Sequence, residues 1–217
     1  MKTRVLPATT STLTVLAVAA GLGGAACGEV ATPAYPGEAL AILRGVVGNP
    51  AGLALPAGAS AHLVWDDAGV GGGRSQVAAS TTVETRLPAN FSIALYTTPP
   101  PAVVGSGDDF AAARGHVVVV NDQQLDDLAN GRAVEGVHGR NDRFQLVWLK
   151  DDAAAAAETA RLGLPTSLTP GFHLLSQPDD DGSAADADAV EGAPFAPVPL
   201  ASIIPLQLVE DTAGGGP

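Results

Sequence analysis

The sequence predicts a mainly β protein: a single antiparallel β-sandwich of about seven or eight strands, with one short helix near residues 151–162. Short apolar runs recur along the chain, and Gly, Pro, Asn and Asp separate them, as turn residues separate strands. Apolar residues make up 46% of the 217 residues, which is enough to build a core. No repeat of 20–50 residues is visible, and this argues against solenoids and propellers.

The candidate strands differ in how far they are expected to be buried. Apolar and polar residues alternate in 77–87, 91–95 and 144–149, as in strands with one face inward, and Val77 is expected on the inward face of its strand. The continuous β-branched run 117–120 suits a strand that is buried on both faces. Pro205 has no backbone N–H to donate, so its strand is expected at a sheet edge. The candidate strands are residues 40–47, 61–65, 77–87, 91–95, 117–120, 144–149, 172–175 and 203–209.

Helix signals are few. Asp151 or Asp152 can cap a helix that runs through five alanines to Leu162, and Gly163 and Pro165 can end it. A weaker helical turn is predicted over residues 123–129.

The chain divides into four parts by composition. Residues 1–26 read as a signal peptide, 27–38 as a Gly-, Pro- and Ala-rich tether, and 39–209 as the sandwich domain. Within the domain, residues 178–192 are acidic and small and are expected to form a mobile loop. Residues 210–217 are expected to be a disordered tail.

The leader has the layout of a secretory signal. Lys2 and Arg4 are basic, the stretch from Val5 to Ala26 carries no charge, and the first acidic residue is Glu29. Its apolar part is too short and too interrupted for a lasting membrane span. The uncharged stretch ends at Cys27, the only cysteine of the chain.

Gly24-Ala25-Ala26-Cys27 resembles the lipobox of bacterial lipoproteins, although that family usually has an aliphatic residue where Gly24 stands. The resemblance implies that Cys27 becomes the new N-terminus, carries acyl chains such as palmitate, and anchors the protein to a membrane. Gly28 is not the Asp that favours inner-membrane retention in that family, so an outer-membrane envelope location is expected. The alternative is ordinary cleavage at the same bond, which gives a secreted or periplasmic protein with a free thiol.

A second resemblance concerns the fold. Leu43–Val47, a turn and Ala61–Trp65 look like the opening of transthyretin-like and carboxypeptidase-regulatory-like sandwiches, and Leu87–Leu95 resembles their next strand. The likeness covers residues 39–100. The same segment also resembles an uncharacterised group of bacterial lipoproteins that have such sandwiches. This resemblance implies no catalytic residues.

Charge restricts the partners. The net charge is −12 and the pI is about 4.5, which argues against nucleic acid, because binding to phosphate backbones depends on clustered Lys and Arg. An acidic body is also repelled by anionic lipid headgroups. Contact with a membrane is therefore expected through the lipid anchor on Cys27 and not through a basic patch. The sequence identifies no protein or other envelope partner.

The acidic loop contains the weak metal candidates: Asp179, Asp181, Asp186 and Asp188. With Gly182 at the sixth position of an EF-hand loop, the first ligand would be the neutral Gln177 and the closing ligand the short Asp188. At most weak calcium binding is expected, with a dissociation constant of about 10⁻⁴–10⁻³ M. The four histidines are spread along the chain, and no defined metal site or cofactor is predicted.

No catalytic residue is assigned. Val104-Gly105-Ser106-Gly107 lacks the spacing of a nucleophile elbow, and adjacent aspartates on a strand would point to opposite faces. Trp65 and Trp148 are expected in the core. The sequence thus predicts a non-enzymatic, lipid-anchored envelope protein that acts as a binding, scaffolding or surface module. The alternatives are a secreted or envelope hydrolase whose site assembles from distant residues, and a weak calcium-binding module.

Overall fold

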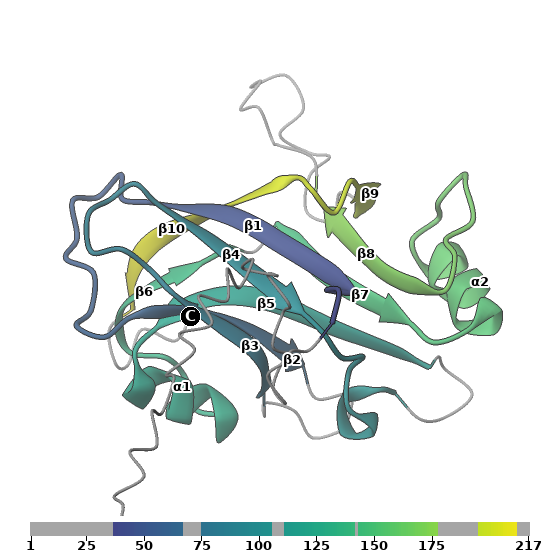
Figure 1. Ribbon diagram of the computed structural model, residues 1–217, viewed down its shortest axis with the longest axis horizontal. Helices are drawn as coiled ribbons and strands as arrows, with labels where there is room; N and C mark the ends of the chain where they lie inside the picture. Colours follow the sequence, from purple (N-terminus) through teal and green to yellow (C-terminus); the bar gives the residue numbers. More distant parts are fainter. Residues whose placement is uncertain (1–36, 67–74, 106–110, 142, 178–194, 212–217) are drawn as a thin grey trace, which may run out of the picture. The chain divides into compact units, whose positions relative to one another are not determined.

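A computed structural model describes residues 37–66, 75–105, 111–141, 143–177 and 195–211, all within a compact unit that spans residues 36–217. The described chain is mainly β (Figure 1). Its strands are β1 Ala41–Gly48, β2 Ser60–Asp66, β3 Ser75–Thr82, β4 Ala89–Leu95, β5 Ala112–Val120, β6 Gly136–Arg140, β7 Phe144–Leu149, β8 Gly171–Ser176, β9 Ala196–Val198 and β10 Ile203–Asp211; its helices are η1 Pro101–Val103, α1 Asp122–Ala129 and α2 Asp152–Arg161.

The strands form one mixed sheet. Its order is β4-β1-β10-β6-β5-β7-β8-β9, and β2 pairs with both β5 and β3. The pair β1–β10 is parallel, with Arg44 opposite Ile203, so the prediction of a purely antiparallel arrangement is wrong at this pair. The other strand pairs that the structure describes are antiparallel.

The sheet curls around a common core. Inward side chains of β1, β4 and β10 meet those of β2, β5, β7 and β8 in one buried cluster. Trp65 of β2, which is 2% exposed, stacks on Phe172 of β8 with ring centroids 6.4 Å apart. Core packing of Trp65 is therefore confirmed, whereas Trp148 is only partly buried at the margin of the cluster.

Two helices cover different parts of the outer face of the sheet. Leu125 and Leu128 of α1 pack on a cluster formed by β2 and β5. Ala154 and Ala155 of α2 pack on β5, β7 and β8. The run 117–120 is buried on both faces, as predicted, because alternate residues of β5 face the common core and α1.

Both helices begin and end as their sequences indicate. The Asp151 side chain accepts a hydrogen bond from the Ala154 backbone N–H at 3.0 Å, and Gly163 has a φ of +62° just beyond the helix end. Helix α1 starts with a capping box between Asn121 and Gln124. The predicted helix near 151–162 is confirmed, and the weaker turn at 123–129 is a second short helix.

Several strand predictions need correction. The structure describes ten strands, more than the seven or eight predicted. The additional strands are β6 and β9, whose sequences do not indicate a strand. Strand β10 lies between β1 and β6 and is not at an edge. Its proline is tolerated because Pro205 precedes the part that pairs with β6, Gln207–Asp211. The same strand extends to Asp211, two residues into the segment that was expected to be disordered.

Candidate functional site

The residues with the most specific predicted roles lie outside the described part of the chain. They are the lipidation candidate Cys27 and the weak calcium candidates Asp179, Asp181, Asp186 and Asp188. The acidic segment 178–192 and the serine of the sequence Gly105-Ser106-Gly107 also lie there. These predictions remain predictions.

The four histidines lie in separate surroundings. His116 Nδ1 on β5 is 3.0 Å from Asp66 Oδ1 at the end of β2. His138 Nδ1 is 3.1 Å from the Gly136 carbonyl oxygen, and His173 Nε2 is 2.6 Å from the Thr169 carbonyl oxygen. In the described ranges, no three His, Cys, Asp or Glu side chains come together in a way that could hold a metal ion.

Paired aspartates have local structural partners. Asp151 caps α2, and Asp127 of α1 forms an ion pair with Arg132 at 2.6 Å. Asp66 marks the end of β2 and contacts His116. Asp66 thus lies at a strand end and Asp151 at a helix cap, whereas the doublet Asp126-Asp127 lies inside α1 and is neither.

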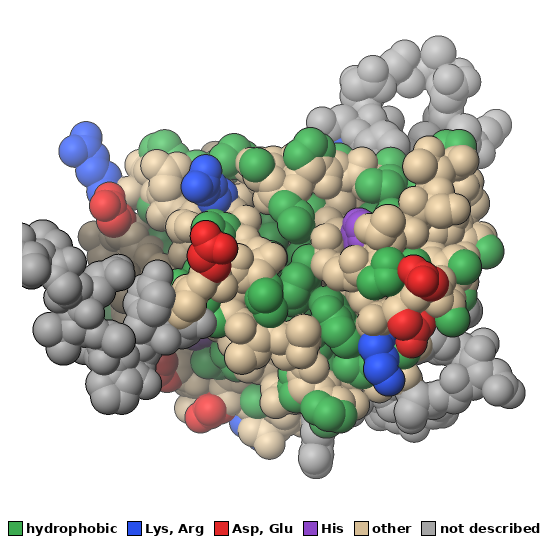
Figure 2. All heavy atoms as spheres, turned by 45° about the vertical axis from the view of Figure 1, so that its right-hand side comes forward, with side chains coloured by type: hydrophobic (Ala, Val, Ile, Leu, Met, Phe, Trp, Pro, Cys, Tyr) green, Lys and Arg blue, Asp and Glu red, His purple; other side chains and the backbone are tan. Residues whose placement is uncertain are grey.

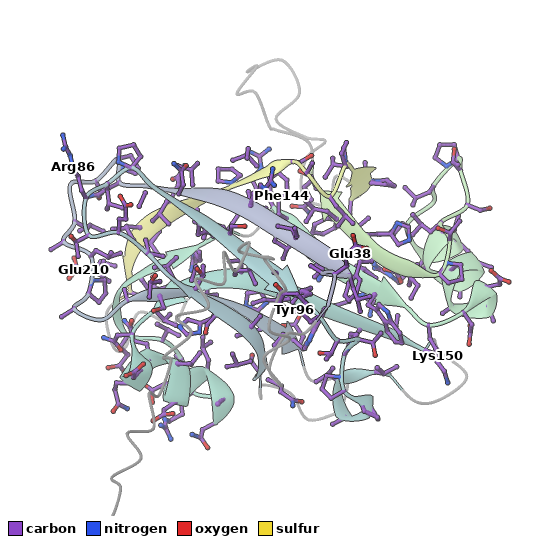
Figure 3. The ribbon with its side chains drawn as sticks, viewed as in Figure 1. Glu38, Arg86, Tyr96, Phe144, Lys150 and Glu210 are labelled. Carbon is purple, nitrogen blue, oxygen red and sulfur yellow. The ribbon has the colours of Figure 1, made fainter. Side chains whose placement is uncertain are left out.

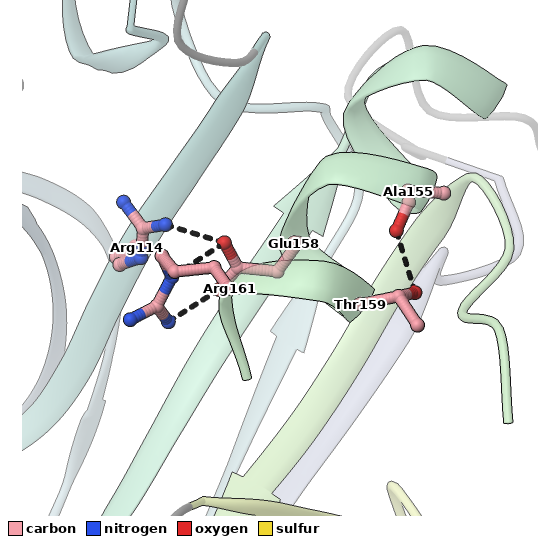
Figure 4. Close-up of polar contacts among 5 residues, drawn as sticks. All are labelled: Arg114, Ala155, Glu158, Thr159 and Arg161. Atoms are coloured by element: carbon pink, nitrogen blue, oxygen red, sulfur yellow. Dashed lines mark hydrogen bonds and ion pairs between the residues drawn. The ribbon is translucent and has the colours of Figure 1, made fainter. Parts of the chain in front are cut away.

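A buried ion triad joins α2 to β5 (Figure 4). The Glu158 side chain is 0% exposed; Arg114 Nη2 donates to its Oε2 at 2.6 Å, and Arg161 Nη2 donates to its Oε1 at 2.6 Å. Arg161 Nε donates a further hydrogen bond to Glu158 Oε2 at 2.9 Å. The side chains of Arg114 and Arg161 are 32% and 41% exposed. Solvent therefore reaches the two guanidinium groups but not the carboxylate of Glu158.

The triad fixes the charge of its acid. Burial alone would raise the pKa of Glu158, but the hydrogen bonds from Arg161 and the charge of Arg114 outweigh burial and hold that pKa below its ordinary value. The same hydrogen bonds raise the pKa of Arg161. Glu158 is therefore a permanent carboxylate at neutral pH, and its arrangement is that of a structural clamp between helix and sheet.

Sequence reasoning missed Glu158, although a signal was present. Ala154, Ala155, Glu158 and Leu162 share one face of α2 by their helical spacing, and all four are buried. A lone acid on an otherwise apolar helical face needs a cationic partner when that face is buried. Nothing in the sequence indicates that Arg114, 44 residues earlier, supplies part of that charge.

His62 is the second unusual polar residue. It lies on the outward side of β2, is 6% exposed, and its Nδ1 is buried without a hydrogen-bond partner. Burial lowers the pKa of His62 from its ordinary value of 6.5, although the charge of Asp122 and a hydrogen bond with the Val120 backbone act in the opposite direction. His62 is thus neutral in the folded protein at pH 7.

This neutral histidine should make folding sensitive to mild acid. The unfolded chain binds a proton at His62 more readily than the folded chain does. The contribution of neutral His62 to the free energy of unfolding is therefore complete above about pH 6.5 and is lost as the pH falls below that value. We expect wild type to lose more unfolding free energy between about pH 7 and pH 5 than the His62→Phe variant does. Urea denaturation across this range measures the difference.

The His173→Phe variant provides the control, because it removes a histidine on another strand, β8, and keeps His62. It should still lose more unfolding free energy over this pH range than the His62→Phe variant does. If removal of either histidine changes the pH dependence equally, burial of His62 is not its cause.

Two of the hollows on the surface of the described domain lie beside β1 and β4. One of about 540 Å³ is bordered by the end of β1, Leu87-Pro88 and Pro205-Gln207 of β10. The other, of about 340 Å³, separates β3 from β4 and is lined by Trp65, residues 76–79 and residues 94–98. Strand β3 pairs with β2 and β4 with β1, so the second hollow follows a seam between two strands that are not hydrogen-bonded to each other.

Apolar side chains reach the surface next to this seam. The large hydrophobic residues exposed in the described ranges are Leu40, Ile42, Val77, Tyr96 and Ile203, at 53%, 41%, 39%, 43% and 55%. Four of them, with Ala94, border the seam or the neighbouring outer surface of β1 and β4. We call this set, Leu40, Ile42, Val77, Ala94 and Tyr96, the apolar face.

Comparison with known proteins gives no relative: no family model, no curated protein and no solved structure matches this chain. Among the described residues, no helix has the length and apolar character needed to cross a bilayer. The function of this mainly β protein has to be inferred from its own residues.

Proposed function

We propose that this protein is a lipid-anchored envelope protein whose β domain is a non-enzymatic binding, scaffolding or surface module. The observation that carries the proposal is the position of Cys27. The only cysteine of the chain follows directly on an uncharged segment that has a basic start and ends in small residues. This is the place where lipoproteins are cleaved and acylated.

The organisation of the domain is compatible with removal of the leader. The three buried clusters of the described part draw their residues from positions 41–208, so cleavage before Cys27 removes none of them. Fourteen residue steps separate Cys27 from Ala41 at the start of β1, and an extended chain of that length spans at most about 50 Å. The domain would therefore stay close to the lipid that holds it.

The remaining parts of the proposal come from the sequence. Gly28 after the cysteine favours the outer membrane, and the acidic net charge leaves acyl chains as the anchor. We also propose that the facing walls of the curled sheet correspond to the two layers of a transthyretin-like or carboxypeptidase-regulatory-like sandwich. Leu43–Val47 on β1 and Ala61–Trp65 on β2 carry that likeness.

The anchor is tested by replacing its only thiol. We expect the protein to partition into detergent and to exceed the mass of the chain that begins at Cys27 by the mass of acyl chains. Cys27→Ser should release it into the soluble extracytoplasmic fraction, since each buried methylene of an acyl chain contributes about 0.8 kcal/mol to membrane binding. Cell fractionation and intact mass measurement detect both effects.

A second variant separates lipidation from plain secretion. Gly24→Leu restores the aliphatic residue that lipoboxes usually have at this position, and it should raise the acylated fraction without altering the mature chain. An unmodified mass for both wild type and Gly24→Leu, with cleavage before Cys27, would contradict the anchor and indicate a secreted protein with a free thiol.

A further inference from the structure

The outer surface of the sheet is covered unevenly. Helix α1 covers part of β2 and β5, and α2 covers part of β5, β7 and β8. The outer surface of β1 and β4 instead presents the apolar face, on which Leu40, Ile42 and Tyr96 each keep more than two fifths of their surface exposed. In the part of the chain that the structure describes, this is where large apolar side chains gather on the surface.

The apolar face is continuous because strand register brings its members together. The Leu40 backbone N–H donates to the Leu95 carbonyl oxygen at 2.7 Å, next to Tyr96, and Ile42 lies directly opposite Ala94. Alternate residues of an extended chain share a face, so Leu40 just before β1 and Ile42 in β1 stand beside Tyr96 just after β4 and Ala94 in β4. Val77 of β3 adds to them from the other side of the seam, in the same hollow as Tyr96.

Charge is sparse at this face. Glu38 precedes Leu40 and is exposed, and Arg44 follows Ile42 on the same side of β1. Figure 3 shows Glu38 and Tyr96 near the start of β1. Acidic side chains of α1, such as Asp122 and Asp126, belong to the element that covers β2 and β5. In Figure 2, hydrophobic side chains reach the surface in the middle of the face in view, with a small number of charged side chains around them.

We propose that the apolar face rests on the lipid bilayer that holds the anchor. This inference relies on the proposed function, because it takes the acyl chains of Cys27 to be in that bilayer. The described chain starts at Gly37, and Leu40 at the beginning of the apolar face is 13 residues after Cys27. The described chain therefore begins beside the apolar face, and an anchor at Cys27 would hold this face near the membrane.

The chemistry of the face suits a lipid interface. Tyrosine places its ring at headgroup level and its hydroxyl in water, and leucine and isoleucine can enter the boundary of the acyl chains. The charged residues that flank Leu40 and Ile42 on the same side of the chain are Glu38 and Arg44, one of each sign, whereas an acidic surface would be repelled by anionic headgroups. The domain would then lie on the membrane in one orientation, with α1 directed away from it.

The test measures how deeply an indole at position 96 enters the bilayer. Tyr96→Trp protein is purified from cells and placed in phosphatidylcholine vesicles with or without brominated acyl chains. A protein acylated at Cys27 is reconstituted directly, and one with a free thiol is coupled through Cys27 to a maleimide lipid. The parent protein gives the background fluorescence of Trp65 and Trp148, which is subtracted. We expect brominated lipid to quench most of the remaining fluorescence, which comes from the indole at position 96.

The matched control places an indole on the opposite covering element. Gln123 is exposed on α1, and the Gln123→Trp variant should show no more quenching than the parent. Adding Leu40→Ser and Ile42→Ser to Tyr96→Trp should abolish quenching at position 96 without changing the unfolding midpoint, because both side chains point outward. Equal quenching at positions 96 and 123, or none at either, would overturn the orientation.

Two other occupants give distinct results. If a second copy of the chain or the uncleaved leader covers the face, the indole at position 96 is shielded from acrylamide in water but is not quenched by brominated lipid, and the proposal is wrong. The proposed function has a separate test: an intact mass that shows no acyl chains on Cys27 would contradict it. Because thiol coupling supplies an anchor in that case, the orientation of the domain is measured either way.

Discussion

Replacing Glu158 by alanine is expected to lower the free energy of unfolding by about 3–5 kcal/mol at neutral pH. The variant leaves Arg114 and Arg161 close together at the margin of a buried cluster, without the carboxylate that both of them contact at 2.6 Å. It also opens a space where a fully buried side chain stood. Urea denaturation followed by circular dichroism measures the loss.

Two variants isolate the cause. Glu84 is exposed between β3 and β4, and Glu84→Ala should change stability by no more than about 0.5 kcal/mol. Glu158→Gln keeps most of the volume but removes the charge, so its loss should approach that of alanine if charge pairing dominates. A Glu158→Gln protein as stable as wild type would show that packing, not the ion triad, joins α2 to β5.

The triad also predicts how the free energy of unfolding falls at low pH. The pKa of Glu158 is lower in the folded protein than its ordinary value of 4.5, so the stabilisation is present above about pH 4.5. It is lost as the pH falls through the folded-state pKa, because the folded chain must then accept a proton that the unfolded chain binds more readily. The Glu158→Gln variant should lack this part of the acid sensitivity, which lies below the range in which His62 acts.

Local signals were sufficient for many elements of the fold. The alternation in residues 91–95 gave β4 with Phe91, Ile93 and Leu95 buried, and Asp151 with Gly163 gave the limits of α2. These signals work because a strand's side-chain period and a helix's capping bonds depend on neighbours a few residues away. The lone acid on the alanine face of α2 belongs to the same class and could have been recognised.

Contacts between distant residues could not be inferred in this way. The parallel pairing of Arg44 with Ile203 joins the beginning and the end of the domain, and no local pattern distinguishes it from an antiparallel pair. Strand β6 contains two glycines in five residues and β9 contains a proline in three, so each lacks a strand signal of its own. The predicted inward face of β3 was also wrong at Val77, which is 39% exposed beside the seam.

The apolar face was hidden for a related reason. Ile42 and Leu43 are both aliphatic, and only the pairing of β1 with β4 and β10 shows which of them faces the core. Leu43 is 0% exposed and Ile42 is 41% exposed. A continuous apolar run predicts a strand that is buried on both faces. In β1 the inward side is buried, whereas Ile42 on the outward side is not covered by any residue that the structure describes.

Phe91→Ala is expected to cost about 3–5 kcal/mol of unfolding free energy, a large part of the roughly 5–15 kcal/mol that stabilises a typical domain. Phe91 is 5% exposed and lies directly opposite Gly45 of β1. Its ring occupies the space that a side chain at Gly45 would need, since a Cβ there would overlap the ring. Removing the ring would leave a cavity against the β1 backbone, which the paired strands cannot close by moving together.

The matched control for this loss is Phe144→Ala. Phe144 starts β7 and packs at the margin of the same cluster, but it is only partly buried, so the protein can fill the space with water and should lose clearly less stability. Thermal and urea unfolding of both variants compare the two sites directly. Equal losses would contradict the prediction, because the cost of the same deletion would then not depend on how deeply the ring is buried.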